Sequence, residues 1–444
     1  MSEAAAPKQS IMDKFQAVME RTIVPIGMKI SQQKYLAAIR DGMTVMIPIT
    51  IIGGFACLLA VPPAPVGLTG GNIFADFLLA WQAWAAANAS VLMIPYHMTI
   101  GIISVFVVCG VAYQLAQTYK MDGVNNMLCA LLVFLCVSDA VDLETVSISI
   151  SKLGASYMFG AMMIGLLVVE INHQCIKHNI SIKLPASVPP NVAAPFNVLI
   201  PMTFSVVGFT LLNVLCTAVT GAGITSLVYT IFQPLLSATG SLPSVLLINV
   251  IMTTFWFFGI HGANMVSVVT SPITTAALAA NLEAYQANQP LPYIFSGAVN
   301  SVFGNWITYF AILLVVLFFC KSSQLKSVAK VASVPCVFNI NEPMIFGMPT
   351  VLNVFTYVPL LICSIINFST YYLLADAGIL GRFYITLPFT VPGPLQAFLA
   401  TMDPKTIVLY FVLLAVDVLV CLPFIKAYDK TLVEAETAQE KLAA

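Results

Sequence analysis

Charged side chains are scarce in this sequence. Lysine and arginine together number 18, aspartate and glutamate number 19, and 8% of the 444 residues are charged. Soluble domains carry roughly 25% charged residues. A chain this poor in charge cannot cover a water-exposed surface with ionic groups, so most of its surface must face lipid. The formal net charge of -1 gives no basis for binding nucleic acid.

Two further absences narrow the class of protein. The 10 cysteines form no Cys-x-x-Cys pair, and most of them lie in or beside apolar runs. We interpret them as small apolar helix residues and expect no redox role, no metal site and no cofactor. The first 40 residues contain scattered lysines and arginines and no uninterrupted apolar core, so we expect no cleaved signal peptide.

Apolar residues, in contrast, are abundant. They make up 59% of the chain, and the mean hydropathy is +0.94. A helix needs about 20 apolar residues to cross a bilayer. With one or more shorter proline-broken segments, the sequence predicts an all-α polytopic membrane protein with about ten transmembrane helices. The main candidate spans are 42–62, 91–115, 124–141, 153–171, 196–219, 245–258, 303–319, 355–374 and 407–425.

The order of these segments suggests five parts. Residues 1–41 are too polar to span a membrane and form an amphipathic pattern, which favours a helix on the cytoplasmic membrane surface over a soluble tail. Residues 42–220 contain about five spans. Residues 221–242 lack charge and contain glycine and proline, as expected for a linker with a short interfacial helix. Residues 243–430 form the second half, and 431–444 a cytoplasmic tail.

Basic residues recur on every second connection between spans. Lys120, Lys177, Lys183 and Lys321 fall on one side when the N-terminal basic cluster is placed in the cytoplasm. The positive-inside rule therefore predicts that both termini are cytoplasmic.

Three apolar stretches of the second half are interrupted by proline, glycine and asparagine: 255–264, 334–349 and 386–394. Proline removes a backbone donor, and an unpaired backbone group in hydrocarbon costs several kcal/mol. Broken helices are therefore tolerated only where protein or a water-filled cavity surrounds them, and transporters use such breaks as substrate sites. The pattern predicts re-entrant hairpins and a binding site in this half.

Two ionisable residues lie at these breaks. Glu342 follows Asn341 inside an apolar stretch, where a charge costs at least about 2.5 kcal/mol on insertion scales. It is either a functional group or a carboxylate that caps free backbone amides. His261 lies between glycines that would let a ligand approach; alternatively it is a core histidine, or a partner of Glu342. Asp417 is a second buried carboxylate, which pairs across helices or acts in transport.

At these breaks the sequence resembles a known family. Trp-Phe-Phe-Gly-Ile-His-Gly at 256–262 and Asn-Ile-Asn-Glu-Pro-Met-Ile-Phe-Gly-Met-Pro at 339–349 are similar to the enzyme IIC membrane component of lactose/cellobiose/N,N'-diacetylchitobiose phosphotransferase systems. Lys-Leu-Pro-Ala-Ser-Val-Pro at 183–189 resembles the family's loop before its fifth helix. The resemblance covers nearly the whole chain, in the right order.

The resemblance implies a fold and a function. The first half would dimerise, and the second would carry a sugar site between two re-entrant hairpins and move like an elevator. The chain would take up a β-linked disaccharide in the bacterial inner membrane and release it 6-phosphorylated. The phosphoryl group would come from a phosphocysteine on a separate cytoplasmic enzyme IIB, since the segment after Ile425 is too short for such a domain. The chain itself is then a permease subunit, with enzyme IIB acting in trans.

The same resemblance implies the site residues. His261 and Glu342 would hydrogen-bond sugar hydroxyls, and Glu342 would orient or deprotonate the hydroxyl to be phosphorylated. The other predicted sugar contacts are Gly262, Asn264, Asn341, Phe389 and Thr390.

Departures from the family pattern leave the substrate open. Phe389 stands where members often have tryptophan, and Phe303-Gly304-Asn305-Trp306 replaces a run that is often rich in glycine. We therefore do not choose among cellobiose, chitobiose and lactose. The rival hypothesis is an ion-coupled secondary transporter that uses Glu342 or Asp417 as a proton carrier, although intramembrane ionisable groups are too few and too far apart for a typical relay.

Overall fold

A computed structural model gives the fold of most of the chain. It describes residues 33–62, 69–71, 73–142, 145–182, 185, 190–259, 261–297, 299–348 and 353–443. The amphipathic helix expected near the N-terminus and most of the segment 183–189 lie outside the described residues.

The first half consists of helices joined by short connections. One antiparallel ladder, formed by β1 (Val141–Asp142) and β2 (Ser147–Ile148), joins α8 to η3. The helices are α3 (Lys34–Thr44), α4 (Ile47–Ala60), α5 (Ile73–Leu92), α6 (Ile94–His97), η2 (Ile100–Ile102), α7 (Ile103–Thr118), α8 (Gly123–Val137), η3 (Ile150–Leu153), η4 (Ala155–Tyr157), α9 (Met158–Lys177) and α10 (Pro190–Thr220).

Helix α11 (Ile224–Thr239) occupies the segment predicted as a linker. The second half then alternates long helices with short ones. They are α12 (Leu242–Phe257), α13 (Gly262–Gln286), α14 (Val299–Phe303), α15 (Asn305–Phe319), α16 (Ser323–Val337), α17 (Glu342–Gly347), α18 (Val354–Asp376), α19 (Gly393–Thr401) and α20 (Lys405–Ala443).

The helices confirm the all-α membrane fold. Among the described residues, 7 helices are long and apolar enough to cross a membrane, and up to 8 if α3 and α4, bent by 41°, make one span. Helices α8 and α12 are apolar but shorter. The total of about ten transmembrane helices, like the five-part division, stays a prediction.

Two of the long helices, α5 with 20 residues and α13 with 25, were missing from the spans expected from sequence. In the structure, α13 is long and apolar enough to cross a membrane. It was not assigned as a span from the sequence, because its serines, threonines and Pro272 lower its apolar signal. Helix α5 also lies where no span was assigned, because its alanines form a helix without a strong apolar signal.

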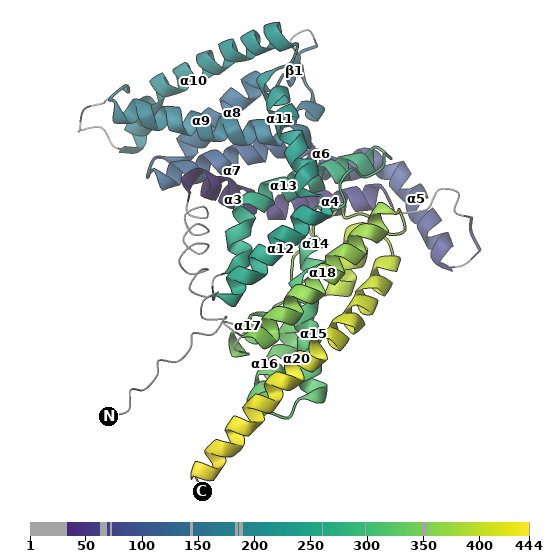
Figure 1. The fold of residues 1–444 in the computed structure, drawn as a ribbon. Coiled ribbons are helices and arrows are strands. Elements are labelled where there is room, and N and C mark those ends of the chain that lie inside the picture. Colours follow the sequence, from purple (N-terminus) through teal and green to yellow (C-terminus); the bar gives the residue numbers. More distant parts are fainter. Residues whose placement is uncertain are drawn as a thin grey trace, which may run out of the picture.

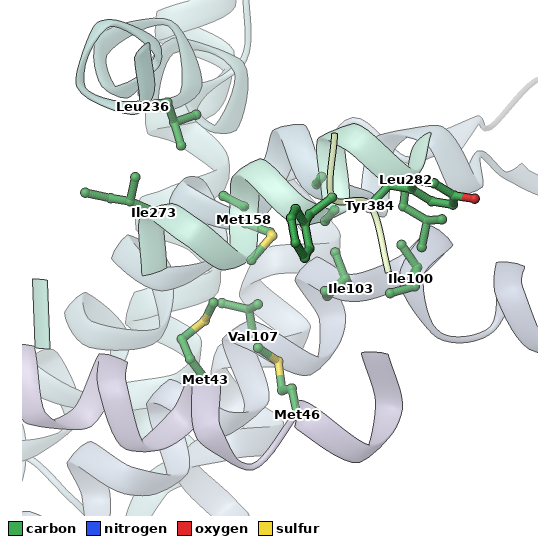
Figure 2. Packing of buried hydrophobic residues seen from close by; sticks show 14 of the residues in the cluster. Met43, Met46, Ile100, Ile103, Val107, Met158, Leu236, Ile273, Leu282 and Tyr384 are labelled. Atoms are coloured by element: carbon green, nitrogen blue, oxygen red, sulfur yellow. The ribbon is translucent and has the colours of Figure 1, made fainter. Parts of the chain in front are cut away.

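Helix α13 packs against the first half. Figure 1 shows α7, α8, α9 and α10 gathered in one group, α15, α16, α18 and α20 in another, and α12 and α13 between them. Close up, Leu282 of α13 and Tyr384 lie beside Ile100 and Ile103 of the first half (Figure 2). One continuous buried cluster therefore includes residues from both halves, so α13 is the main structural link between them.

A second buried cluster joins α15, α16, α18 and α20. Tyr309, Leu325, Ala329, Cys363 and Cys421 are among its fully or nearly fully buried members. In lipid such helices associate by close side-chain packing rather than by withdrawal from water. This bundle supports the helix α16, which leads to Glu342.

Candidate functional site

His261 stands at the break between α12 and α13. Gly259 turns the chain with a φ of +76°, and His261 is the N-cap of α13. Its Nδ1 atom accepts a hydrogen bond from the backbone N–H of Asn264, with an N–N distance of 3.2 Å. A neutral ring therefore carries its proton on Nε2. The side chain is exposed, and among the described residues Nε2 has no partner, so it can donate to a ligand.

Two neighbours hold this break in shape. The ring centroids of Trp256 and His261 are 4.4 Å apart. Gly262 is buried, and a Cβ atom placed on it would lie 2.0 Å from the carbonyl oxygen of Met252. Only glycine fits there without moving a helix. The demand for glycine at 262 therefore comes from packing against α12, in addition to any ligand contact.

A second break separates α14 from α15 at Gly304. Asn305 donates a hydrogen bond from Nδ2 to Oγ1 of Thr253, which ties this break to α12 at 2.8 Å. The ring centroids of Trp306 and Phe389 are 6.4 Å apart. The departures noted at 305 and 306 therefore lie beside the predicted site, although the sequence assigned no role to either residue.

The third break, between α16 and α17, contains Asn339. Its Nδ2 atom lies 3.0 Å from the carbonyl oxygen of Phe389 and 2.9 Å from that of Val391. It also lies 3.4 Å from Oε1 of Gln396, whose Nε2 donates to Oγ of Ser301 at 3.0 Å. The contacts of Asn339 join two of the three interrupted segments that the sequence predicted as parts of one site, 334–349 and 386–394.

Asn341 and Glu342 begin α17. The Asn341 side chain is 0% exposed, and neither its Nδ2 nor its Oδ1 has a hydrogen-bond partner among the described residues. Leaving such a buried polar group unpaired costs about 1–3 kcal/mol, so Asn341 is a strong candidate for a ligand contact. The backbone of Glu342 forms the first residue of α17, whereas its side chain lies outside the described residues.

Phe389 and Thr390 are the central residues of a turn. The N–H of Val391 donates to the carbonyl oxygen of Pro388 at 3.0 Å and closes that turn. The Phe389 side chain is 53% exposed. An exposed ring held by a closed turn offers an apolar face against which a sugar ring could stack.

The structure thus brings some predicted residues together and leaves others apart. The backbones around Asn341 and Glu342 are tied to Phe389 and Thr390 through Asn339. Within the described part of the chain, no hydrogen bond or ring contact joins His261 to these two turns. The Asn264 side chain is exposed on the first turn of α13.

Two larger cavities flank α13 in the described part of the structure. One of about 270 Å³ lies between α12 and α13 and is lined by Asn249, Ala263 and Ser267, among others. Another of about 210 Å³ lies between α3, α4 and the second half, with Thr386 and Ser301 in its wall. The first begins next to the His261 break, and the second next to the turn at 388–391.

Asp417 is fully buried among α15, α18 and α20. Its Oδ2 accepts hydrogen bonds from Oγ1 of Thr308 at 2.8 Å and from Nδ2 of Asn367 at 3.0 Å. Both donors are neutral. Oδ2 therefore pairs across three helices, which is one of the two interpretations made from the sequence, whereas Oδ1 has no hydrogen-bond partner among the described residues.

An apolar helix bundle with interrupted helices, two of whose breaks are joined through Asn339, is typical of a polytopic α-helical membrane transporter. The family model for the phosphotransferase system EIIC component matches residues 40–364. The chain belongs to this family of sugar permeases, and with its apolar helices it is an integral protein of the bacterial inner membrane.

Individual relatives agree. The chain is 32% identical over 432 residues to the lactose-specific EIICB component of Lacticaseibacillus casei, covering 94% of this chain and 72% of the relative. It is 32% identical over 431 residues to the oligo-beta-mannoside-specific EIIC component of Bacillus subtilis (strain 168), and the match covers 94% of this chain and 95% of that relative.

A solved structure has the same fold. The crystal structure of the transporter ChbC, the IIC component of an N,N'-diacetylchitobiose-specific phosphotransferase system, matches with a TM-score of 0.85. The two sequences are 27% identical, and the match covers 94% of this chain and 99% of that one. The resemblance stated from the sequence motifs is therefore confirmed.

Proposed function

We propose that this chain binds a β-linked disaccharide at the breaks around His261, Asn341 and Phe389 and carries it across the membrane for phosphorylation. The relatives are specific for lactose, oligo-β-mannosides and N,N'-diacetylchitobiose. These sugars differ in their rings and share a β-glycosidic linkage. A β-linked disaccharide of the cellobiose, chitobiose or lactose type is the substrate class that fits all three.

The chemistry of the predicted site suits a neutral sugar. A disaccharide offers many hydroxyl groups, each of which can both donate and accept. Nε2–H of His261 is a donor, the Asn341 amide is both donor and acceptor, and Phe389 presents a ring face. The buried, unpaired amide of Asn341 is the observation that carries this proposal, because a ligand hydroxyl would complete its hydrogen bonds.

Glu342 is the proposed catalytic residue. Its carboxylate would accept a hydrogen bond from the 6-hydroxyl of the sugar and take its proton as that oxygen attacks the phosphorus. The new O–P bond replaces the S–P bond of a phosphocysteine, and the cysteine thiolate leaves. That phosphocysteine belongs to a cytoplasmic enzyme IIB acting in trans, so this chain supplies substrate binding and orientation.

Movement, assembly and orientation complete the proposal. The second half, 243–430, carries the sugar by an elevator-like motion against the first half, 42–220. The first half forms a homodimer within the lipid bilayer, and both termini are cytoplasmic. The ion-coupled alternative is not favoured, because the family model and the relatives identify a sugar permease of the phosphotransferase type.

The decisive test is binding of a panel of disaccharides to the purified protein in detergent, without a phosphoryl donor. We expect saturable binding of one β-linked disaccharide in detergent. In a separate uptake assay, Glu342→Gln should abolish uptake of that sugar, because an amide cannot take the hydroxyl proton. Glu434→Gln, on the exposed part of α20, is the matched control and should behave as wild type.

Absence of sugar binding, together with pH-dependent uptake of another solute by liposomes, would favour the ion-coupled transporter instead. Normal uptake by Glu342→Gln would contradict the role given to this carboxylate.

A further inference from the structure

We propose that Asn339 is a positioning residue that clamps the turn before Glu342 to the turn containing Phe389, so that both sides of the sugar site keep one geometry. The inference deepens the proposed function and rests on it for the sugar measurements. Asn339 would not touch the sugar itself; it would act through the two turns.

The first argument is the number of acceptors around one amide. Nδ2 of Asn339 carries two hydrogens, and the carbonyl oxygens of Phe389 and Val391 lie 3.0 and 2.9 Å away. Both carbonyls belong to the 388–391 turn, one at its centre and one at its end. Asn339 itself is 4% exposed, so water does not compete for these hydrogen bonds. A single buried side chain therefore holds this turn through two hydrogen bonds.

The second argument is the network that continues from this amide. Gln396 of α19 is 0% exposed, and its Oε1 lies 3.4 Å from Nδ2 of Asn339. Its Nε2 donates to Ser301 of α14 at 3.0 Å. The clamp therefore connects four segments of the second half: the α16–α17 turn, the 388–391 turn, α19 and α14.

The third argument is the backbone at the end of α16. Asn339 has a φ of +58°, the N–H of Ile340 bonds the carbonyl of Pro335 at 3.0 Å, and the N–H of Asn339 bonds that of Cys336 at 3.1 Å. This is a Schellman ending, in which glycine is the usual residue at the position of Asn339. Glycine would end the helix equally well but would leave the Phe389 turn without its donors.

The consequence is preorganisation of the site. Asn341 and Glu342 follow Asn339 by two and three residues, so a fixed Asn339 fixes the position of their backbone relative to the Phe389 turn. A site whose contacts are already aligned loses less entropy when its ligand binds. We therefore expect the clamp to contribute to sugar affinity without contributing to the helix end.

The test compares Asn339→Gly and Asn339→Asp with wild type. Glycine keeps the positive φ and removes the amide, so a residue that only ended α16 would be replaced without effect. We expect about tenfold weaker sugar binding by isothermal titration calorimetry for Asn339→Gly. Asn339→Asp should bind still more weakly, because its carboxylate would face three oxygen atoms. Wild-type affinity in Asn339→Gly would overturn the proposal.

Asn126→Ala is the matched control. Asn126 is a fully buried, hydrogen-bonded asparagine of α8 in the first half. This substitution should lower the unfolding temperature and leave sugar affinity unchanged. An equal loss of affinity in Asn126→Ala would attribute the effect of Asn339→Gly to general destabilisation and would overturn the positioning role.

Hydrogen–deuterium exchange of the sugar-free protein gives a readout that does not depend on the proposed function. In Asn339→Gly we expect faster exchange in 386–392, with unchanged exchange in the first half. Unchanged exchange in 386–392 would overturn the clamp. If wild type binds no disaccharide, the proposed function fails, while this exchange measurement still decides whether Asn339 holds the turn.

Discussion

Single side chains at the chain breaks differ in which hydrogen bonds they leave open. His261 uses Nδ1 to cap α13 and keeps Nε2 free of partners among the described residues. The Asn341 amide is buried with both polar atoms unpaired among the described residues, whereas Nδ2 of Asn339 donates to two carbonyl oxygens. A side chain with unpaired donors and acceptors suits a ligand contact, whereas a side chain whose donors are already paired within the protein suits a positioning role.

The imidazole of His261 is expected to contribute directly to sugar affinity. His261→Ala should weaken binding by about 1–3 kcal/mol, since it removes one hydrogen bond and leaves its sugar partner unpaired. His261→Asn keeps an N-cap acceptor and removes the imidazole, so it should lose affinity without destabilising α13. Titration calorimetry measures both variants. His178→Ala, at an exposed position after α9, should bind as wild type.

Unchanged affinity in His261→Asn would return His261 to a purely structural role at the start of α13.

Sequence reasoning identified His261, Asn341 and Phe389 from residue type and from the breaks around them. It missed Asn339, whose partners lie about 50 residues away in the chain, and no local pattern reveals such a contact. The position of Asn339 in the motif at 339–349, which also contains Asn341 and Glu342, was the one signal that the sequence offered.

Helix α16 is secured at its start by the last helix of the chain. Asp429 of α20 accepts hydrogen bonds from the backbone N–H groups of Lys321 at 2.9 Å and Ser322 at 2.8 Å. Glu436, two turns further along α20, accepts from the N–H of Gln324 at 3.1 Å. Negative charge at a helix N-terminus is favourable. The two carboxylates therefore hold the helix that leads to Glu342.

Removing one of these acceptors should destabilise the second half. Asp429→Ala leaves two backbone donors without their partner and should cost about 1–3 kcal/mol of stability. The unfolding temperature of the purified protein measures this. Glu434→Ala, on the same helix, removes only an exposed pair with Lys430 at 3.9 Å and should leave the unfolding temperature nearly unchanged. Equal unfolding temperatures for both variants would show that the contact of α20 with α16 contributes nothing.

Across the whole molecule, the C-terminal end of α13 is bonded to the first half. Oε1 of Glu283 accepts a hydrogen bond from the N–H of Ala155 at 2.8 Å. The hydroxyl of Tyr285 donates to the carbonyl oxygen of Val61 at 2.9 Å. If 243–430 moves against 42–220, these bonds must break in each transport cycle.

A covalent link at this interface should therefore stop transport. Ala155→Cys with Glu283→Cys, in a background without native cysteines, should abolish uptake after reaction with a short thiol-specific cross-linker. Sugar binding in detergent should persist, since the link lies away from the chain breaks. Each single cysteine variant, treated in the same way, should retain uptake. Full uptake by the cross-linked pair would contradict motion between the halves at this interface.

The sequence by itself determined that this protein lies in a lipid membrane and which region of the chain contains the predicted site. Sparse charge and long apolar runs require lipid, and proline, glycine and asparagine inside those runs require protected breaks, whatever the fold. These are properties of local composition. The motifs at 256–262 and 339–349 were also sufficient to identify the family.

Only the tertiary structure decided which breaks meet. The bonds from Asn339 to the Phe389 turn, from Asn305 to Thr253 and from Asp429 to the start of α16 join residues more than 40 positions apart. Helix α13 escaped sequence analysis because its serines and threonines lower its apolar signal, yet it is long and apolar enough to span a membrane and packs against the first half. Long-range partners depend on helix packing, and no local pattern in the chain contains that information.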